Sequence, residues 1–544
     1  MRPGLRRASF ALVASLLACH AREVTPATSA ADVPEAPAAP ACEPLPLCPQ
    51  EPAEDAVALD DVAQWRRIEE ILAGPPERVD IGEVSALLSQ ASDPSVDVSA
   101  VLTNLDAMAQ EVRASLPPRC DARCRARNLT RWMFRVWRFE AEEDPNGLYN
   151  DPDRDLIDRV IESRVGYCEG LSVLYMALAH RLDVPVVGVL SRQHIHVRYV
   201  GPGGSFDIDT TREGGPPLPS PDPPGCHARE GVYGAGLDAR GMVGQVVSVV
   251  GILEGLPARR AWLDAAVRLA PMDPDLRNNR GVDRERTLDL AGALDDYRSA
   301  SELDPCVGFY RTNVAGALRR LGRVDEAAAV LDGLGRDAQN RSVEEDGLYL
   351  PLARGDLALE RGDDAEASRW YGAAVQGSRE APIAHESLGI ARLVQGDYRG
   401  AAEEFLGALE RDPRADTRMW LVEALAEAGD DNATTELDRA ERDGASEDDV
   451  LLWRAQLAAR AGRWAEARTL ASRCLAVAGS RCARGLVVLG EASRAQGDAV
   501  CARRYWEGFL GCRGVPRDRY RRALESRVRA SLSGLSSASS DAGR

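Results

Sequence analysis

The segment Gly166–Ser172, GYCEGLS, opens a run of apolar and helix-forming residues that continues as LSVLYMALAHRL. The sequence Asp183-Val184-Pro185 ends this predicted helix, because proline disfavours helical geometry in the residue before it. A cysteine, Cys168, therefore stands at the first turn. The free N–H groups and the positive dipole end of a helix favour the reactive thiolate there. Cys168 is a candidate nucleophile, with a disulfide partner or a small buried side chain as the alternatives.

The chain after this helix changes its period from helical to alternating. The runs VPVVGVL, HIHVRYV and SFDIDTT are rich in β-branched residues or alternate between apolar and polar, and Gly201-Pro202-Gly203-Gly204 supplies a turn between the last two. This part of the chain predicts an α+β unit in which a helix packs on a small sheet. The proline-rich stretch that follows, residues 212–243, predicts a loop.

The strands that follow Cys168 carry the other groups that thiol catalysis requires. A nucleophilic cysteine needs an imidazole to exchange its proton and a carboxylate or amide to orient the imidazole. HIHVRYV offers His194 and His196, and SFDIDTT offers Asp207 and Asp209. Strand parity cannot choose between them, because residues two apart share one face.

Helical periodicity dominates both sides of this central part. Residues 60–165 contain the amphipathic runs WRRIEEIL, IGEVSALLSQ, VLTNLDAMAQEVRASL and LTRWMFRVWRFEA. Beyond residue 243 the chain is helical to its end, and glycines recur at spacings of 34, 33, 33 and 35 residues: Gly362, Gly396, Gly429, Gly462 and Gly497. A 34-residue period is the signature of tetratricopeptide repeats.

A small residue is expected five positions after each repeat glycine, where the two helices of a repeat touch. Ala367, Ala401, Ala467 and Ala502 supply it, and Thr434 is the exception. The segments around Gly322 and Ala293 continue the pattern upstream, with an insertion near residue 340. Stacked repeats form a concave surface, so we expect them to bind a protein partner.

The first residues have the layout of an export signal. Arg2, Arg6 and Arg7 precede the apolar run ASFALVASLLA, which is too short to span a bilayer as a mature helix, and Cys19 follows it. The sequence Leu16-Leu17-Ala18-Cys19 resembles the lipobox of bacterial lipoproteins, which implies that Cys19 carries a lipid. We therefore expect a protein of the bacterial cell envelope, periplasmic or at the outer membrane, that is anchored to a membrane by its lipid.

Composition bounds the partners. The 544 residues are 44% hydrophobic, enough for several domains, and carry 67 basic and 85 acidic side chains for a net charge of −18, with arginine supplying every basic group. Such a surface repels phosphate backbones, so no nucleic acid is expected. Twelve cysteines suit an oxidising compartment, and ten remain to pair once Cys19 and Cys168 are set aside. Cys120 and Cys124 lack a second pair at metal-ligand spacing, so we expect no metal and no cofactor.

The order of cysteine, histidine and aspartate resembles that of transglutaminase-like thiol enzymes. From about residue 78 to 300 the chain is similar to bacterial SirB-type transglutaminase-like proteins with C-terminal tetratricopeptide repeats. The matching segments are DLIDRVIESRVGYCEGLSVLYMALAHRLDVPVVGV, QHIHVRY, FDIDTTREGG and RLAPMDPDLRNNRGVDRERTLDLAGALDDYRSASELDP. Many members have Ile-Pro where this chain has Tyr167-Cys168, so this chain retains a nucleophile that they lack.

The resemblance also implies a choice between the paired candidates. The family's histidine strand reads Pro-Gly-His, three residues and Arg, so with Arg198 as the reference His194 takes the histidine position and His196 a usually apolar one. Arg192-Gln193 replaces the Pro-Gly. The family's Ile-Asp-Pro matches Ile208-Asp209-Thr210, which favours Asp209 over Asp207.

These observations predict a multidomain protein in which an α+β transglutaminase-like, papain-like domain precedes an all-α tetratricopeptide solenoid. The expected divisions are a signal peptide at 1–18, a lipidated flexible tether at 19–58, the transglutaminase-like domain with its helical N-terminal part at 59–250, repeats at 251–530 and a disordered tail at 531–544. The leading hypothesis is a thiol acyltransferase or hydrolase acting through Cys168, His194 and Asp209. The alternative is a non-catalytic scaffold with a relic domain.

Overall fold

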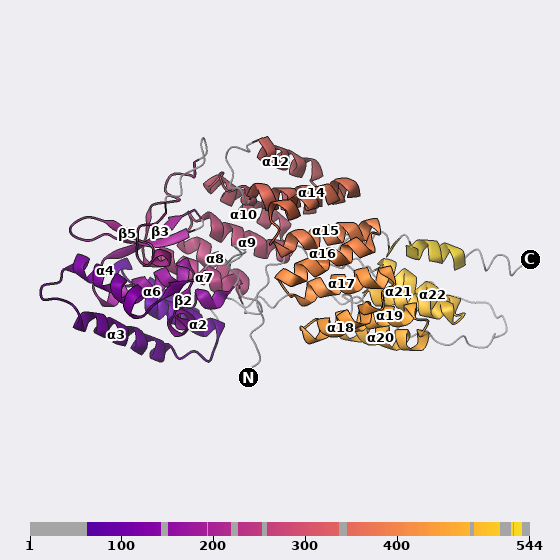
Figure 1. The fold of residues 1–544 in the computed structure, drawn as a ribbon, viewed down its shortest axis with the longest axis horizontal. Coiled ribbons are helices and arrows are strands. Elements are labelled where there is room, and N and C mark those ends of the chain that lie inside the picture. Colours follow the sequence, from indigo (N-terminus) through magenta and orange to yellow (C-terminus); the bar gives the residue numbers. More distant parts are fainter. Residues whose placement is uncertain are drawn as a thin grey trace, which may run out of the picture. The chain divides into compact units, whose positions relative to one another are not determined.

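A computed structural model describes nine stretches of the chain: residues 63–142, 151–192, 194–218, 227–252, 258–336, 345–478, 483–511, 524–525 and 527–535. The predicted signal peptide, Cys19 and the tether lie outside the described residues, as does the predicted tail apart from residues 531–535, which are helical. The chain divides into two compact units, with the boundary between Glu345 and Asp346 (Figure 1).

The first unit begins with helices whose first turns are capped by aspartates. Asp80, Asp97 and Asp121 each accept a hydrogen bond from a backbone N–H in the first turn of the helix that follows. The elements are α1 (Ala63–Leu72), η2 (Pro76–Arg78), α2 (Ile81–Ser92), α3 (Val98–Ala114), α4 (Ala122–Arg131), the π-helical turn η3 (Trp132–Val136), β1 (Glu140–Ala141), η4 (Pro152–Arg154), α5 (Ile157–Ser163) and β2 (Val165–Gly166). The predicted helix at 129–141 thus ends at Val136 and gives way to a short strand.

The centre of this unit is helix α6 (Cys168–Arg181), which packs against α2, α3 and α5 and against strand β4 (Figure 1). The sheet has the order β5-β4-β3-β6, all antiparallel, from β3 (Val186–Ser191), β4 (His194–Tyr199), β5 (Phe206–Ile208) and β6 (Gly236–Leu237). This confirms the predicted α+β arrangement.

The alternation along β4 separates the core from the polar side chains. Ile195, Val197 and Tyr199 are buried in the hydrophobic core, whereas His194, His196 and Arg198 occupy the intervening positions on the other face. The core is one continuous cluster that extends from Trp65 in α1 to Leu276 in α9. The buried face of β4 is therefore fixed in the apolar core, and this holds the histidines on the opposite face of the strand in place.

The remainder of the first unit is helical. Strand β5 is followed by η5 (Thr210–Arg212), and α7 (Ala239–Ile252) begins inside the segment predicted as loop, because that segment's last residues, ARGMV, contain no proline and continue into the apolar run that forms the helix. Then follow α8 (Arg259–Leu269), α9 (Pro274–Arg286), α10 (Leu290–Leu303), α11 (Gly308–Arg320) and α12 (Val324–Arg336). Several of these early repeat helices belong to the same unit as the sheet.

The second unit is a succession of helix pairs in which each helix packs against its neighbours in the chain (Figure 1). The π-helical η7 (Glu345–Tyr349) lies at its start, with all residues but Glu345 in the second unit. The helices are α13 (Leu350–Arg361), α14 (Asp364–Gly377), α15 (Pro382–Gln395), α16 (Tyr398–Arg411), α17 (Ala415–Ala428), α18 (Asn432–Arg442), α19 (Glu447–Arg460), α20 (Trp464–Ala478), α21 (Ala483–Ala495) and α22 (Ala499–Gly511). Within the described residues no helix is at once long and apolar enough to cross a membrane.

The repeat glycines all occupy one structural position. Each follows the first helix of a pair with φ between 71° and 82°, the left-handed conformation that glycine adopts without strain. The predicted alanines, among them Ala367 and Ala401, are fully buried. Thr434 is exposed, and Ala433 takes the buried position instead. In this repeat the buried small residue follows the glycine by four residues and not by five.

Candidate active site

Cys168 is the first residue of α6, and its thiol is free and partly exposed. Tyr167 before it is extended and provides no side-chain cap, and its N–H bonds to the Arg154 carbonyl oxygen at 3.0 Å. One N–H of the first turn, that of Gly170, donates to the Asp155 carboxylate at 3.0 Å. The structure therefore places the thiol at a helix N-terminus, as the sequence predicted. Arg154 and Asp155, from the segment before α5, hold this end of the helix by their hydrogen bonds.

His194 and Asp209 form a hydrogen-bonded pair. The His194 Nε2 atom lies 3.1 Å from Asp209 Oδ2. The second carboxylate oxygen of Asp209 accepts the backbone N–H and the hydroxyl of Thr211, at 3.0 and 2.8 Å. Because Asp209 is buried and held on both oxygens, it fixes the orientation of the imidazole.

The charge states of this pair follow from their contacts. Burial lowers the pKa of His194. Hydrogen bonds to Asp209 and Cys168, and the negative charges on both, raise the pKa by more than burial lowers it, so that it reaches about 10. Burial raises the pKa of Asp209, whereas its bonds to His194 and Thr211 lower it, and the balance lies below its usual value. The site thus favours a protonated imidazole between a carboxylate and the Cys168 sulfur.

The rival pair is held apart from this arrangement. His196 Nε2 lies 3.6 Å from Asp207 Oδ1, and His196 Nδ1 lies 3.4 Å from the Ser191 hydroxyl. Arg198 holds Asp207 with two hydrogen bonds, of 2.5 and 3.2 Å, and lowers the pKa of that carboxyl. Burial lowers the pKa of His196. The structure therefore joins His194 to Asp209 and commits Asp207 mainly to an arginine.

Acidic side chains to which the sequence assigned no role gather around Glu169, the residue after Cys168. One oxygen of Glu169 is buried and has no hydrogen-bond partner among the described residues. Burial, then the negative charges of Asp155 and Cys168, raise the pKa of Glu169 well above its usual value, and burial raises the pKa values of Asp155 and Asp273 to about 7. A charged residue at a helix entrance normally faces water; here Asp155 and Asp273 approach it from distant segments, and no local pattern signals that.

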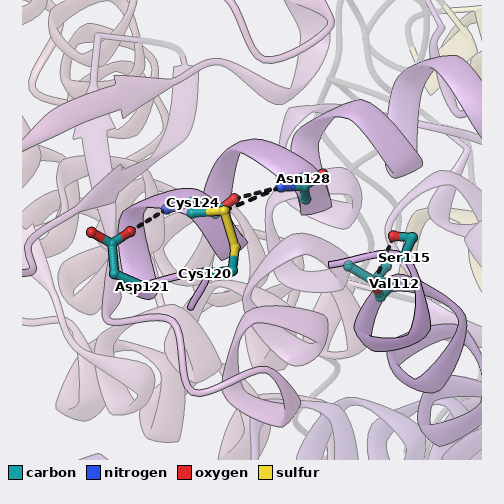
Figure 2. The surroundings of a disulfide bond; sticks show 6 residues. All are labelled: Val112, Ser115, Cys120, Asp121, Cys124 and Asn128. Atoms are coloured by element: carbon teal, nitrogen blue, oxygen red, sulfur yellow. Dashed lines mark hydrogen bonds between the residues drawn. A yellow bond between two sulfur atoms is a disulfide. The ribbon is translucent and has the colours of Figure 1, made fainter. Parts of the chain in front are cut away.

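The cysteines of the described residues are otherwise engaged in disulfides. Cys120 and Cys124 form one across the start of α4, where Asp121 Oδ1 accepts the Cys124 N–H and Asn128 donates to the Cys124 carbonyl oxygen (Figure 2). Cys306, Cys474 and Cys501 are also disulfide-bonded. No group of three or more histidine, cysteine or acidic side chains in the described part of the chain is arranged to hold a metal ion.

Comparison with known proteins identifies the first region. Residues 99–218, which contain Cys168, His194 and Asp209, match the model of the transglutaminase-like superfamily. A UPF0162 protein of Pseudomonas aeruginosa is 33% identical over 96 residues, which are 18% of this chain and 34% of that protein. A UPF0162 protein of Xylella fastidiosa is 26% identical over 194 residues, 32% of this chain and 67% of that protein. This chain thus spans only 34% of the length of the first of these relatives.

Comparison with solved structures gives partial matches at low TM-scores. A tetratricopeptide repeat protein from Parabacteroides merdae is 16% identical with a TM-score of 0.37, covering 47% of this chain and 98% of that one. PilW, a type IV pilus biogenesis factor, is 16% identical with a TM-score of 0.31, covering 38% and 96%. The family match and the glycine-capped helix pairs described above together show that residues 99–218 form a transglutaminase-like domain and that a long tetratricopeptide-like helical region follows it.

Proposed function

We propose that this protein is an exported, lipid-anchored thiol acyltransferase or hydrolase that acts on an amide or ester through Cys168, His194 and Asp209. The observation that carries the proposal is the 3.1 Å contact between His194 Nε2 and Asp209 Oδ2 beside a free thiol at a helix N-terminus. With Nε2 engaged by Asp209, Nδ1 is the ring nitrogen that exchanges a proton with the Cys168 sulfur. The three residues come from three different elements, as a nucleophile, base and orienting group normally do.

The reaction proceeds in two halves. The Cys168 thiolate attacks the carbonyl carbon, and the backbone N–H of Cys168 is the natural donor to the oxygen that becomes negative. His194 then gives its proton to the departing amine or alcohol, which leaves a thioester on Cys168. In the second half His194 takes a proton from water or from an amine as it attacks the thioester. Water gives hydrolysis and an amine gives transamidation, and either restores the thiolate–imidazolium pair.

Two further parts of the proposal concern location and partners. The run that ends at Cys19 supports lipidation there, and the helix pairs of the second unit support binding of a protein partner. Replacement of Cys19 by serine should release the protein from membranes or leave it unprocessed, measured by detergent partition and by N-terminal mass. A wild-type chain recovered as a soluble species cleaved elsewhere would contradict the anchor.

The test of the catalytic site is the pH dependence of Cys168 alkylation by iodoacetamide, with the modified peptide identified by mass. Wild-type Cys168 should react rapidly near pH 6.5, two units below the pKa of about 8.5 of an ordinary thiol. His194→Ala should move the profile to higher pH, because the imidazolium that stabilises the thiolate is lost. Asp209→Ala should move it in the same direction by less.

His196→Ala and Asp207→Ala are the matched controls, since each makes the same change two residues from its counterpart, His196 on the strand of His194 and Asp207 on β5, which ends just before Asp209. They should leave the profile close to that of the wild type. Sensitivity of the control pair alone would transfer the roles to His196 and Asp207. A Cys168 that is disulfide-bonded, or whose profile ignores all four changes, would leave a scaffold function for the repeats as the remaining proposal.

A further inference from the structure

The turn that leads into the histidine strand is tied to a helix of the early repeats. Arg192 directly follows Ser191, the last residue of β3, and its guanidinium bonds to the Asp304 carboxylate at the end of α10 through Nε at 2.9 Å and Nη2 at 3.3 Å. The Asp304 side chain is fully buried, and that of Arg192 is 14% exposed. A bidentate pair of this kind combines strength with a fixed direction, unlike an exposed ion pair.

Asp304 is itself fixed by its other neighbours. The Tyr233 hydroxyl donates to Asp304 Oδ2 at 2.7 Å, and the Cys306 N–H donates to Oδ1 at 2.9 Å. The Arg192 guanidinium lies 5.5 Å from the centre of the Tyr233 ring, so the same tyrosine contacts both partners. The carboxylate is therefore a fixed anchor for the arginine.

The anchor acts on the end of the ladder from which His194 projects. Ser191 pairs with His194 in the β3–β4 register, and this pair is the last of the ladder. At the turn end of the hairpin the last pair has ladder neighbours on one side only, so its placement depends on how the adjoining turn residue is held. Catalytic groups need placement within about 0.5 Å, and a misplacement of 1 Å costs up to about a hundredfold in rate.

We propose that Arg192 is a positioning residue for His194 and that Asp304, supplied by the early repeat helices, holds it in place. This inference rests on the proposed catalytic role of His194 and extends it: the repeats complete the support of the active site as well as presenting a surface to a partner. In this proposal the effect of Arg192 reaches the imidazole through the Ser191–His194 end of the ladder, and the imidazole is faced by Cys168, Asp209 and His196.

The experiment measures the rate of Cys168 alkylation from pH 5 to 9 in the full-length protein carrying Arg192→Gln or Asp304→Asn. Both variants should label Cys168 about tenfold more slowly at pH 6.5 and should move the profile toward that of His194→Ala. In the double variant Arg192→Gln, His194→Ala the arginine change should add little, because its effect passes through the histidine.

Arg280→Gln is the matched control. Arg280, in α9, makes the same bidentate bond to a buried carboxylate of α10, that of Asp296, at 2.9 and 2.7 Å, and is 15% exposed; it also donates to Asp264 at 2.9 Å. Its loss should cost at least as much stability and leave the Cys168 profile unchanged. A merely structural role for Arg192 would give the two arginine variants the same profile, and that result would overturn the inference.

A second variant keeps the test decisive if the charge changes impair folding. Tyr233→Phe removes one hydroxyl bond to Asp304 and keeps the ring against Arg192, so it should give a smaller shift, about twofold to threefold, in the same direction. Wild-type labelling in Tyr233→Phe, Arg192→Gln and Asp304→Asn, alongside slow labelling in His194→Ala, would overturn this inference alone. Wild-type labelling in His194→Ala would remove the proposed function as well.

Discussion

The transglutaminase-like part of the first unit and the repeats of the second unit bury their apolar side chains in different ways. In the first unit a single cluster runs from Trp65 to Leu276 and joins helices and strands that are far apart in sequence. In the second unit the apolar clusters are smaller, and each joins helices that are neighbours in the chain. One cluster extends from Leu393 to Ala424 and another from Val422 to Trp453. Long-range packing brings Cys168, His194 and Asp209 together, whereas neighbour packing extends a surface.

Buried charges separate the two regions in the same way. In the repeats of the second unit buried glutamates have arginine partners, as Glu436 has Arg418 at 2.8 Å. Near Cys168, Asp155 and Glu169 have no ion pair with any described residue, and burial raises both pKa values. Glu436 is thus paired with arginine where it is buried, whereas the domain keeps acids without an arginine partner beside its thiol. Such concentrations of perturbed acids are typical of functional sites.

The largest effect should come from the cores. Leu174→Ala, at a fully buried position of α6, should cost about 2–5 kcal/mol and weaken amide protection across α2, α6 and β4 together, because one cluster joins them. Leu421→Ala, equally buried in α17, should cost a similar amount but weaken protection only in the adjacent helices.

Hydrogen exchange followed by mass spectrometry measures both variants peptide by peptide. Loss of protection limited to α6 in Leu174→Ala would show that the apolar cluster is not one cooperative unit. Loss across all of the second unit in Leu421→Ala would show that the repeats are as cooperative as the domain.

The next effect is a pH-dependent gain in stability on replacing Asp155 by asparagine. Burial raises the pKa of Asp155 from 3.8 to about 7, so the folded state disfavours its ionised form. Stability contributed by the protonated acid is present below about pH 4 and is lost as the pH rises through 7. Asparagine can still accept the Gly170 N–H bond but carries no charge. Asp155→Asn should therefore match the wild type near pH 4 and exceed it at pH 8.

Glu436→Gln is the opposite case. It removes a charge that two arginines use, Arg418 at 2.8 Å and Arg439 at 2.5 Å, and should destabilise its repeat at pH 8. Exchange rates of α6 and α18 peptides at the two pH values, corrected for intrinsic exchange, give both results. A loss of stability in Asp155→Asn at pH 8 would mean that its carboxylate is compensated.

The sequence predicted the periodic part of the fold more fully than the part made by long-range contacts. A 34-residue spacing located the repeat glycines, and each proved to be a left-handed helix end. The exception at Thr434 arose because a fixed offset cannot register a repeat that is shortened by one residue. Helix α6 and three strands were predicted from their period, whereas the start of α7 was hidden by the proline-rich stretch before it.

The candidate site divides along the same line. Order along the chain and a family resemblance pointed to His194 and Asp209, and the structure brings these two together. The sequence carried no signal for Asp155 beside Glu169 or for Asp304 beside Arg192, 112 residues away, because each contact depends on how distant elements pack. The boundary between the two compact units, at Glu345 and Asp346, also differs from the domain boundary predicted near residue 250. The reason is the same: helices with repeat character pack in one unit with the sheet.

The smallest effect tests the glycine at a repeat helix end. Gly362 has φ of 80° and nothing within 4 Å of an added Cβ, so Gly362→Ala meets no clash and only backbone strain, about 1 kcal/mol. Gly372 also has open space around an added Cβ but lies inside α14, where alanine is the better helix former. Gly372→Ala should therefore stabilise the same repeat by about 0.5–1 kcal/mol. Urea unfolding followed by protection of α13 and α14 peptides should give opposite signs for two chemically identical changes ten residues apart. Equal signs would mean that helix propensity alone, and not the left-handed end, sets the stability of the repeat.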